Sequence, residues 1–416
     1  MIANDVAATV LAAGLSIGVS VACAQRQPET FFKTRVGLSD SEIQKMGHGQ
    51  VVTKVLESGD KKYGILVFGG VYINTSIEQF AASYRDVKSL LEDKVHLDVQ
   101  EFSENGAVPK FSDFDRLTLS HKDIDTIQNC RPHHCDFQVF DVTAFQKQIN
   151  WNSRDKYEQA NKLARQRVHE GATKYISGGL KALGGYTYRD KPFNLYQNMK
   201  SMLDTSYYLP EDKSRGIYQH VLDYPDAKVP GATDFFYWED IDFGQGPTIR
   251  VNRVSMFPQG LGVAKYVITN EQLYASRHIR IALQVFYCVA DTQNPDKPGF
   301  YLIEMNDSRI PDYAGLKHIA VRRIATAKGI ESTRDILNLY LRKLTGKTKA
   351  ESNACRSAYS NSWIIPSSDS PRAPLLLSSP FTYLLRLGRE LSHARYRCFW
   401  DTLASFKMRR KSDHPY

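Results

Sequence analysis

The feature that most constrains the fold is a series of five strand-like segments in the second half of the chain. After Pro225 the sequence becomes rich in aromatic and β-branched residues, which favour strands. The links between these segments are rich in Gly, Pro and Asn, the residues of turns. The segments span residues 235–238, 248–257, 262–269, 278–290 and 299–305. The sequence therefore predicts five consecutive strands joined by turns.

The first part of the chain predicts strands and a capped helix. Residues 50–57 and 63–73 have strand composition, and residues 58–61 (SGDK) between them indicate a hairpin turn. Ser76 with Gln79 three positions later forms the pattern of a capping box, which starts a helix with one apolar stripe. Residues 95–102 alternate between apolar and polar, as in a half-buried strand.

Helices are predicted in the middle and at the end of the body. The strongest pattern covers residues 156–183, where apolar residues recur every three or four positions and Gly184-Gly185 ends the run. Shorter helices are predicted from Asp123, over 142–148, and over 193–203 and 214–222. A long apolar periodicity from Leu316 to Leu344 predicts a final helix, which Gly329 kinks or breaks.

The N-terminal segment resembles a secretory signal peptide. Residues 6–22 are apolar and small, too short for a membrane span, and Ala22-Cys23-Ala24 matches a small-x-small cleavage site. The segment before them carries Asp5 and no Lys or Arg. We therefore expect a signal peptide over 1–24 and a periplasmic or secreted product. Acylation of Cys23 and a buried N-terminal helix are the alternatives.

Two cysteines lie close together in a segment that also carries histidines. His133 and His134 lie between Cys130 and Cys135, and Cys and His are the usual ligands of a zinc site. A single hexapeptide can hardly surround a metal tetrahedrally, so in an oxidising compartment a Cys130–Cys135 disulfide is expected. A metal site and unpaired thiols are the alternatives. Cys288 lies in a strand pattern and is expected to be a buried core thiol.

The positive charge of the chain is concentrated at its C-terminus. Residues 345–416 hold twelve Lys and Arg against five Asp and Glu, a surplus of +7 out of the total of +9. The body is thus nearly neutral, which argues against a nucleic-acid-binding core. The tail is expected to be disordered, because its segment 366–374 has a linker-like composition. A peripheral membrane contact through residues 381–406 is the alternative.

The candidate catalytic and cofactor motifs in the sequence are incomplete or misplaced. Gly346-Lys347-Thr348 lacks the Gly that a phosphate-binding loop needs, because Leu341 stands there. The one Gly-x-Ser-x-Gly string lies within the N-terminal apolar segment. No catalytic residue, metal or cofactor is therefore assigned. A polar set on the predicted strands remains, and inward-facing members of it are expected to line one cavity wall. These candidate ligand-binding residues are Tyr237, Arg250, Asn252, Tyr274, His278 and Tyr287.

The order of elements resembles the START-like helix-grip (SRPBCC) superfamily. A strand, a pair of helices, antiparallel strands and a long last helix follow one another, as in that fold. The resemblance implies an α+β domain over 45–344 in which a curved antiparallel sheet grips a long C-terminal helix, with a cavity between them. Residues 113–222 would be a helical insertion. The chain is also similar to uncharacterised exported bacterial proteins in segments such as 223–225 (DYP), 236–238 (FYW) and 273–276 (LYAS).

The resemblance implies an exported binding protein that holds a hydrophobic small molecule or lipid in an internal cavity. Nucleic acid is not expected as a partner. Two alternatives stay open: a structural or interaction module with a filled core, and a hydrolase or isomerase in which His278 acts as acid or base near neutral pH.

Overall fold

A computed structural model gives the structure of the chain. It describes residues 28–91, 96–131, 135, 137, 142–188, 191–205, 216–242, 246–260, 264–291, 298–313 and 315–346. The predicted signal peptide and C-terminal tail lie outside these residues, as do Cys23, His133 and His134. The larger of two compact units comprises residues 1–241 and 248–346. Within the described part, none of the helices is long and apolar enough to cross a membrane.

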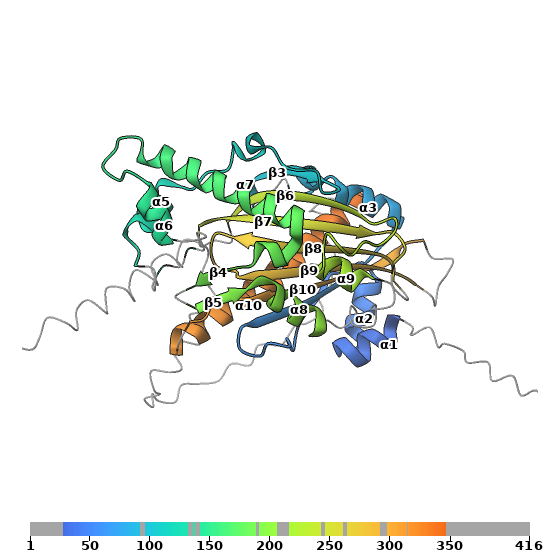
Figure 1. Cartoon of the computed structure of the whole chain (residues 1–416). Coiled ribbons are helices and arrows are strands. Elements are labelled where there is room, and N and C mark those ends of the chain that lie inside the picture. Colours follow the sequence, from blue (N-terminus) through green and yellow to red (C-terminus); the bar gives the residue numbers. More distant parts are fainter. Residues whose placement is uncertain are drawn as a thin grey trace, which may run out of the picture. The chain divides into compact units, whose positions relative to one another are not determined.

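Eight strands form one antiparallel sheet, curved and ordered β1-β2-β10-β9-β8-β7-β6-β3 (Figure 1). The strands are β1 (Val52–Leu56), β2 (Gly64–Ile73), β3 (His96–Glu104), β6 (Thr233–Asp242), β7 (Pro247–Phe257), β8 (Ala264–Ala275), β9 (Ile281–Ala290) and β10 (Phe300–Arg309). The predicted α+β class with an antiparallel sheet is confirmed. From β6 to β10 each strand lies beside the next in sequence, because short turns can only join antiparallel neighbours.

The last strand, β10, lies between β9 and β2 and pairs with both. In its pairing with β2, Glu304 lies opposite Gly69. After β2 the chain leaves through α3 (Ile77–Arg85) and α4 (Val87–Leu90) and returns as β3 at the far edge, beside β6. The predicted capping box starts α3: the Ser76 side chain accepts from the backbone N–H of Gln79, whose side chain accepts from the backbone of Ser76.

Both faces of the sheet are covered by helices, which explains why every residue of β2 is buried. One face, here called the α7 face, packs against helices α1 (Pro28–Phe31), α2 (Asp40–Gly47), α5 (His121–Asn129), α6 (Val142–Gln148), α7 (Lys156–Leu183), α8 (Leu195–Thr205) and α9 (Ile217–Leu222). The other, the α10 face, packs against α3, α4 and α10 (Gly315–Thr345). Figure 1 shows α7, α8 and α9 on one side of the sheet and α10 on the other.

Helix α10 approaches the sheet closely over β2. Its side chains Leu337 and Tyr340 are buried in the apolar cluster of the α10 face. A Cβ atom at Gly69 would lie 2.4 Å from Cγ2 of Thr333 and 2.6 Å from Cδ1 of Leu337, so only glycine fits beneath the helix. The opposite end of α10 is different, since Leu316 is 84% exposed.

Helix α7 has the bounds that the sequence predicts, and so does α6. The backbone of α7 is not helical at Gly178 and Gly179, and Gly179 has a φ of +64°. A Cβ there would lie 1.8 Å from the carbonyl oxygen of Tyr224, so glycine permits the contact between α7 and the segment after α9.

Three sequence predictions of secondary structure are wrong. Helix α10 runs without interruption from Gly315 to Thr345, so the break predicted at Gly329 is absent. The helix predicted from residue 193 begins at Leu195, because residues before it form a two-stranded sheet of β4 (Gly185–Tyr188) and β5 (Lys191–Asn194). The strand predicted from His278 begins at Ile281. His278 has a φ of +69°, and the N–H of Ile279 donates to the carbonyl of Arg277, so this segment is a tight turn.

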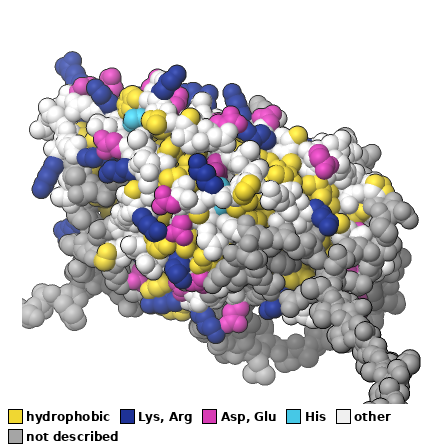
Figure 2. Space-filling view, turned by 45° about the vertical axis from the view of Figure 1, so that its right-hand side comes forward, with side chains coloured by type: hydrophobic (Ala, Val, Ile, Leu, Met, Phe, Trp, Pro, Cys, Tyr) yellow, Lys and Arg dark blue, Asp and Glu magenta, His cyan; other side chains and the backbone are white. Residues whose placement is uncertain are grey.

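The exposed charges of the described part are mixed in sign. Figure 2 shows Lys and Arg side chains interspersed with Asp and Glu on one face, with hydrophobic side chains between them. The face in view thus lacks the single basic stripe that a nucleic-acid-binding surface requires. The expectation that nucleic acid is not a partner stays a prediction.

Candidate polar row on the α10 face

The structure separates the six predicted ligand-binding residues onto two faces of the sheet. Tyr237 belongs to the apolar cluster of the α10 face, and Arg250 and Asn252 lie on the same side, where both contact Glu239. Tyr274 and Tyr287 belong to the cluster of the α7 face. His278 lies in the turn between β8 and β9. The sequence predicted that the six residues line one wall, but they lie on two faces of the sheet and in a turn.

A β-bulge explains part of this separation. In the pairing of β7 with β8, Asn252 lies opposite Gln272 but Val251 lies opposite Tyr274, so Leu273 is the extra residue. A single extra residue reverses the facing of everything beyond it. Tyr274 is thereby turned to the α7 face, although Gln272 faces α10.

Seven polar side chains follow one another across five strands on the α10 face, and we call them the polar row. Its members, from β6 to β10, are Tyr237, Glu239, Asn252, Asn270, Gln272, Gln284 and Glu304. Glu239 and Glu304 are 0% exposed, and Asn252 and Gln272 are 2% exposed. Because buried polar groups lose their hydration, each needs hydrogen bonds to offset that cost.

The β6 end of the row holds a charged pair, Glu239 and Arg250. Glu239 accepts from Nη2 of Arg250 at 2.6 Å and from Nδ2 of Asn252 at 2.8 Å, and its other oxygen lies 3.2 Å from Nε2 of His96. Burial alone would raise the pKa of Glu239, but Arg250, His96 and Asn252 together lower the pKa to about 2. Glu239 is therefore ionised at neutral pH, and its charge is balanced within the cluster.

The β10 end of the row is uncharged. Oε1 of Glu304 accepts from Nε2 of Gln284 at 2.7 Å and from Oγ1 of Thr333, on α10, at 3.4 Å. Burial raises the pKa of Glu304 to about 8, against the smaller opposing effects of Gln284, Thr333 and Asn306. The carboxyl group is thus mostly protonated at pH 7. Since Oε1 accepts two bonds, the proton is best placed on Oε2.

The centre of the row is incompletely partnered. Asn270 donates from Nδ2 to the hydroxyl of Tyr237 at 2.9 Å and approaches Oε1 of Gln284 at 3.4 Å. Neither the amide nitrogen nor the amide oxygen of Gln272 has a hydrogen-bond partner in the described part of the chain, and the same is true of Oδ1 of Asn270 and Oε2 of Glu304. Native interiors rarely leave such groups unpaired, so the centre of the row is the part whose hydrogen bonding is incomplete.

An aromatic cluster lies over the Tyr237 and Glu304 part of the row. The ring centroids of Phe80 and Tyr340 are 5.1 Å apart, those of Tyr84 and Phe286 are 5.3 Å apart, and Tyr84 stacks on Tyr340 at 5.9 Å. These rings come from α3, α10 and β9, so they join the helices to the sheet. They supply an apolar surface next to the polar row.

Three cavities in the described part lie elsewhere. One of about 30 Å³ lies on the α7 face between Tyr175, Tyr186 and Tyr274, and a second of about 10 Å³ lies beside Tyr274 and Ile249. A groove of about 480 Å³ runs between α3–α4 and β3, where Arg85 forms a bidentate pair with Glu101. None of the three is lined by the polar row. The ligand-sized cavity expected beneath the last helix stays a prediction.

A second buried polar cluster, on the α7 face, is closed by its own contacts. Arg253 is 0% exposed and bonds to Asp234 through Nη2 at 2.9 Å and to Glu271 through Nη1 at 3.1 Å. Tyr175 donates to Glu271 at 3.2 Å, and His220 contacts Asp234 at 3.1 Å. Burial raises the pKa of Glu271 to about 7, although Arg253 opposes the rise. The cluster ties α7 and α9 to the sheet.

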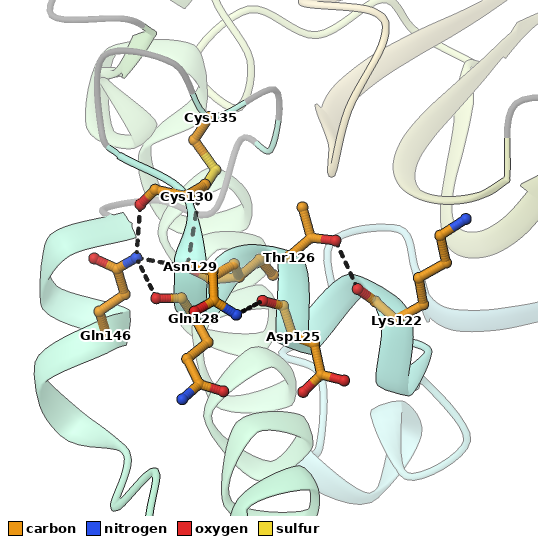
Figure 3. Close-up of a disulfide and its surroundings, with 9 residues drawn as sticks. Lys122, Asp125, Thr126, Gln128, Asn129, Cys130, Cys135 and Gln146 are labelled. Atoms are coloured by element: carbon orange, nitrogen blue, oxygen red, sulfur yellow. Dashed lines mark hydrogen bonds between the residues drawn. A yellow bond between two sulfur atoms is a disulfide. The ribbon is translucent and has the colours of Figure 1, made fainter. Parts of the chain in front are cut away.

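The predicted disulfide joins Cys130 and Cys135 at the end of α5 (Figure 3). Beside it, Nε2 of Gln146 donates to three backbone carbonyls, those of Ile127 at 2.5 Å, Gln128 at 3.2 Å and Cys130 at 2.9 Å. Carbonyls at the end of a helix have no partner within it, and Gln146 of α6 satisfies them here. The disulfide thus closes a segment that is already tied to the next helix. Cys288 is a buried free thiol, as predicted.

Sequence reasoning missed Gln272, Asn270, Gln284 and Glu304 as candidates. For Gln284 and Glu304 a signal was present, because each has apolar strand-forming residues on both sides, whereas Asn270 and Gln272 lie in the polar run 269–272 (TNEQ). Asn270 and Gln272 are two positions apart, which places them on one face of a strand. Recognising the row from the sequence would have required the register of five strands.

Comparison of the chain with protein-family models, with curated proteins and with solved structures found no match.

Proposed function

We propose that this chain is a START-like binding protein that holds a small, mostly apolar molecule, such as a lipid, against the α10 face of the sheet. The polar row would bind the polar group of that molecule. The observation that carries the proposal is Gln272, a side chain 2% exposed whose two amide atoms both lack hydrogen-bond partners in the described structure.

The order and packing of the elements support the same proposal. Strand β2, the helix pair α3–α4, strands β3 and β6 to β10, and the long α10 follow one another as in a helix-grip fold. Glycine at position 69 lets α10 pack directly on β2. The polar row lies on the face that α10 covers, which is where a helix-grip protein holds its ligand.

The described side chains also indicate what binding must change. The rings of Phe80, Tyr84 and Tyr340 fill the space beside Tyr237 and Glu304. An apolar ligand part would contact these rings, so they must shift when it enters. Binding is therefore expected to alter amide hydrogen exchange in the C-terminal half of α10 and in α3.

Export belongs to the proposal as well. We place the mature protein in the periplasm or outside the cell, because the Cys130–Cys135 disulfide is of the kind that persists in oxidising compartments. The N-terminal apolar segment would supply the export signal. Membrane contact through the basic tail remains an expectation on residues outside the described part.

The proposal is tested by extracting small molecules from the full chain purified from an exporting host and analysing them by mass spectrometry. Wild type should release a stoichiometric molecule, and Gln272→Leu should release much less. Thr269→Val is the matched control, since its hydroxyl is also buried without a partner but faces α7. An empty wild-type protein, or equal yields from both variants, would contradict the proposal.

A further inference from the structure

The unpartnered atoms of the polar row define the hydrogen-bonding edge of its ligand. Building on the proposed function, we infer that the row binds an uncharged molecule through a paired donor–acceptor edge, of the kind that a cis amide or lactam presents. The inference rests on which atoms of Gln272, Asn270 and Glu304 remain open and on how charge is distributed along the row.

Gln272 sets the paired character of the edge. Its side-chain amide offers a donor and an acceptor side by side in one plane, and both are unpartnered among the described residues. A cis amide has the complementary arrangement, so two parallel hydrogen bonds can form at once. A ketone or an ether satisfies only the donor, and an ammonium group satisfies only the acceptor, which leaves the other atom buried and unpaired.

The neighbouring atoms of the row extend the same pattern. Oδ1 of Asn270, two residues along β8 on the same face, is open as an acceptor. Oε2 of Glu304 is also open, and it is a donor when the group carries its proton. The row thus offers both acceptors and a donor besides the amide of Gln272, which suits a ligand containing both N–H and C=O.

The charges of the row favour a neutral ligand. The carboxylate of Glu239 is already balanced by the guanidinium of Arg250 at 2.6 Å. The centre of the row consists of amides, and Glu304 is mostly neutral at pH 7 because its burial raises its pKa to about 8. A buried cation or anion would find no opposite charge at Gln272 and would lose its hydration.

The inference is tested with small probes on the full chain by ligand-observed NMR. The probes are δ-valerolactam, N-methyl-δ-valerolactam, cyclohexanone and cyclohexylammonium. Valerolactam should bind about tenfold more tightly than its N-methyl derivative, since methylation removes one of two paired bonds. Gln272→Leu should abolish this preference, and Thr269→Val should preserve it.

Three results would overturn the inference. They are equal binding of both lactams, tightest binding of cyclohexylammonium, and no binding of any probe, which would mean that the open atoms of the row are only hydrated. The proposed function is judged separately, by the molecule extracted from wild type. If an extracted molecule lacks a paired edge, this inference fails and the binding function stands.

Discussion

Gln284 donates a hydrogen bond of 2.7 Å from Nε2 to Oε1 of Glu304, so β9 and β10 are joined on the α10 face by their side chains as well as their backbones. The donor is an uncharged amide and not a cation, which leaves the burial of Glu304 without an opposing positive charge. The protonated form of this carboxyl is therefore favoured in the folded state.

The stability of the protein should consequently fall as the pH rises through the titration of Glu304. Its pKa is about 8 when folded, against an ordinary value of 4.5. A raised folded pKa means that the stabilisation is present below about pH 4.5 and is lost as the pH approaches 8, by roughly 1.4 kcal/mol per pH unit at most. Glu304→Gln should remove this loss, because glutamine keeps the neutral form.

Urea unfolding from pH 5 to pH 9 measures the effect as the difference between wild type and Glu304→Gln. Glu271, with a pKa of about 7, contributes in the same direction to both proteins and cancels in the difference. Parallel curves for the two proteins would show that Glu304 is not neutral when folded.

Gln272→Leu should leave the free energy of unfolding unchanged or raise it by about 1–2 kcal/mol, because it removes an unpaired buried amide. Asn252→Leu is the contrasting variant. It breaks the 2.8 Å bond to Glu239 and should cost about 1–3 kcal/mol. Thermal and urea unfolding of both variants measure the two changes in the free energy of unfolding. If Gln272→Leu is the more destabilised of the two, Gln272 has a structural partner.

Arg253→Met should destabilise the fold by about 3–5 kcal/mol, since Asp234 and Glu271 would keep their burial and lose their cation. Arg116→Met is the control: its partner Asp98 lies 2.5 Å away, but both side chains are partly exposed, and a loss below about 1 kcal/mol is expected. Similar urea midpoints for the two variants would mean that the Arg253 cluster contributes no more than a surface pair.

Gly69→Ala should destabilise the protein by about 1–3 kcal/mol, because the added methyl group would overlap Thr333 and Leu337 of α10. Gly47→Ala, at the end of α2, is the control, since its Cβ would meet only the Tyr301 hydroxyl at an ordinary 3.4 Å. Unfolding curves for both variants test the close approach of α10 to β2. Equal stability would place the helix farther from the sheet.

The sequence predicted elements well where periodicity was long. Helix α7 has the predicted bounds because apolar residues recur on one face over 28 residues. The capped start of α3 and the run of strands β6 to β10 were also predicted. Their pairing into one antiparallel sheet agrees with the expected fold class.

The candidate site was harder to predict because it depends on register. Tyr274 and Gln272 differ by two positions, yet the bulge at Leu273 puts them on opposite faces. His278 was assigned to a strand because its neighbours are strand-forming, whereas its positive φ places it in a turn. The ionisable partners of Glu239 and Arg253 come from residues 11 to 143 positions away in the chain, so no local pattern could reveal them.

The central claim is that the α10 face holds a molecule through the polar row, and native mass spectrometry of the full mature chain tests it most directly. Wild type and Thr269→Val should carry the same adduct, of one mass and near one per chain. Gln272→Leu should carry it in strongly reduced amount while remaining folded. An adduct-free wild type, or an adduct that Gln272→Leu retains in full, would contradict the claim.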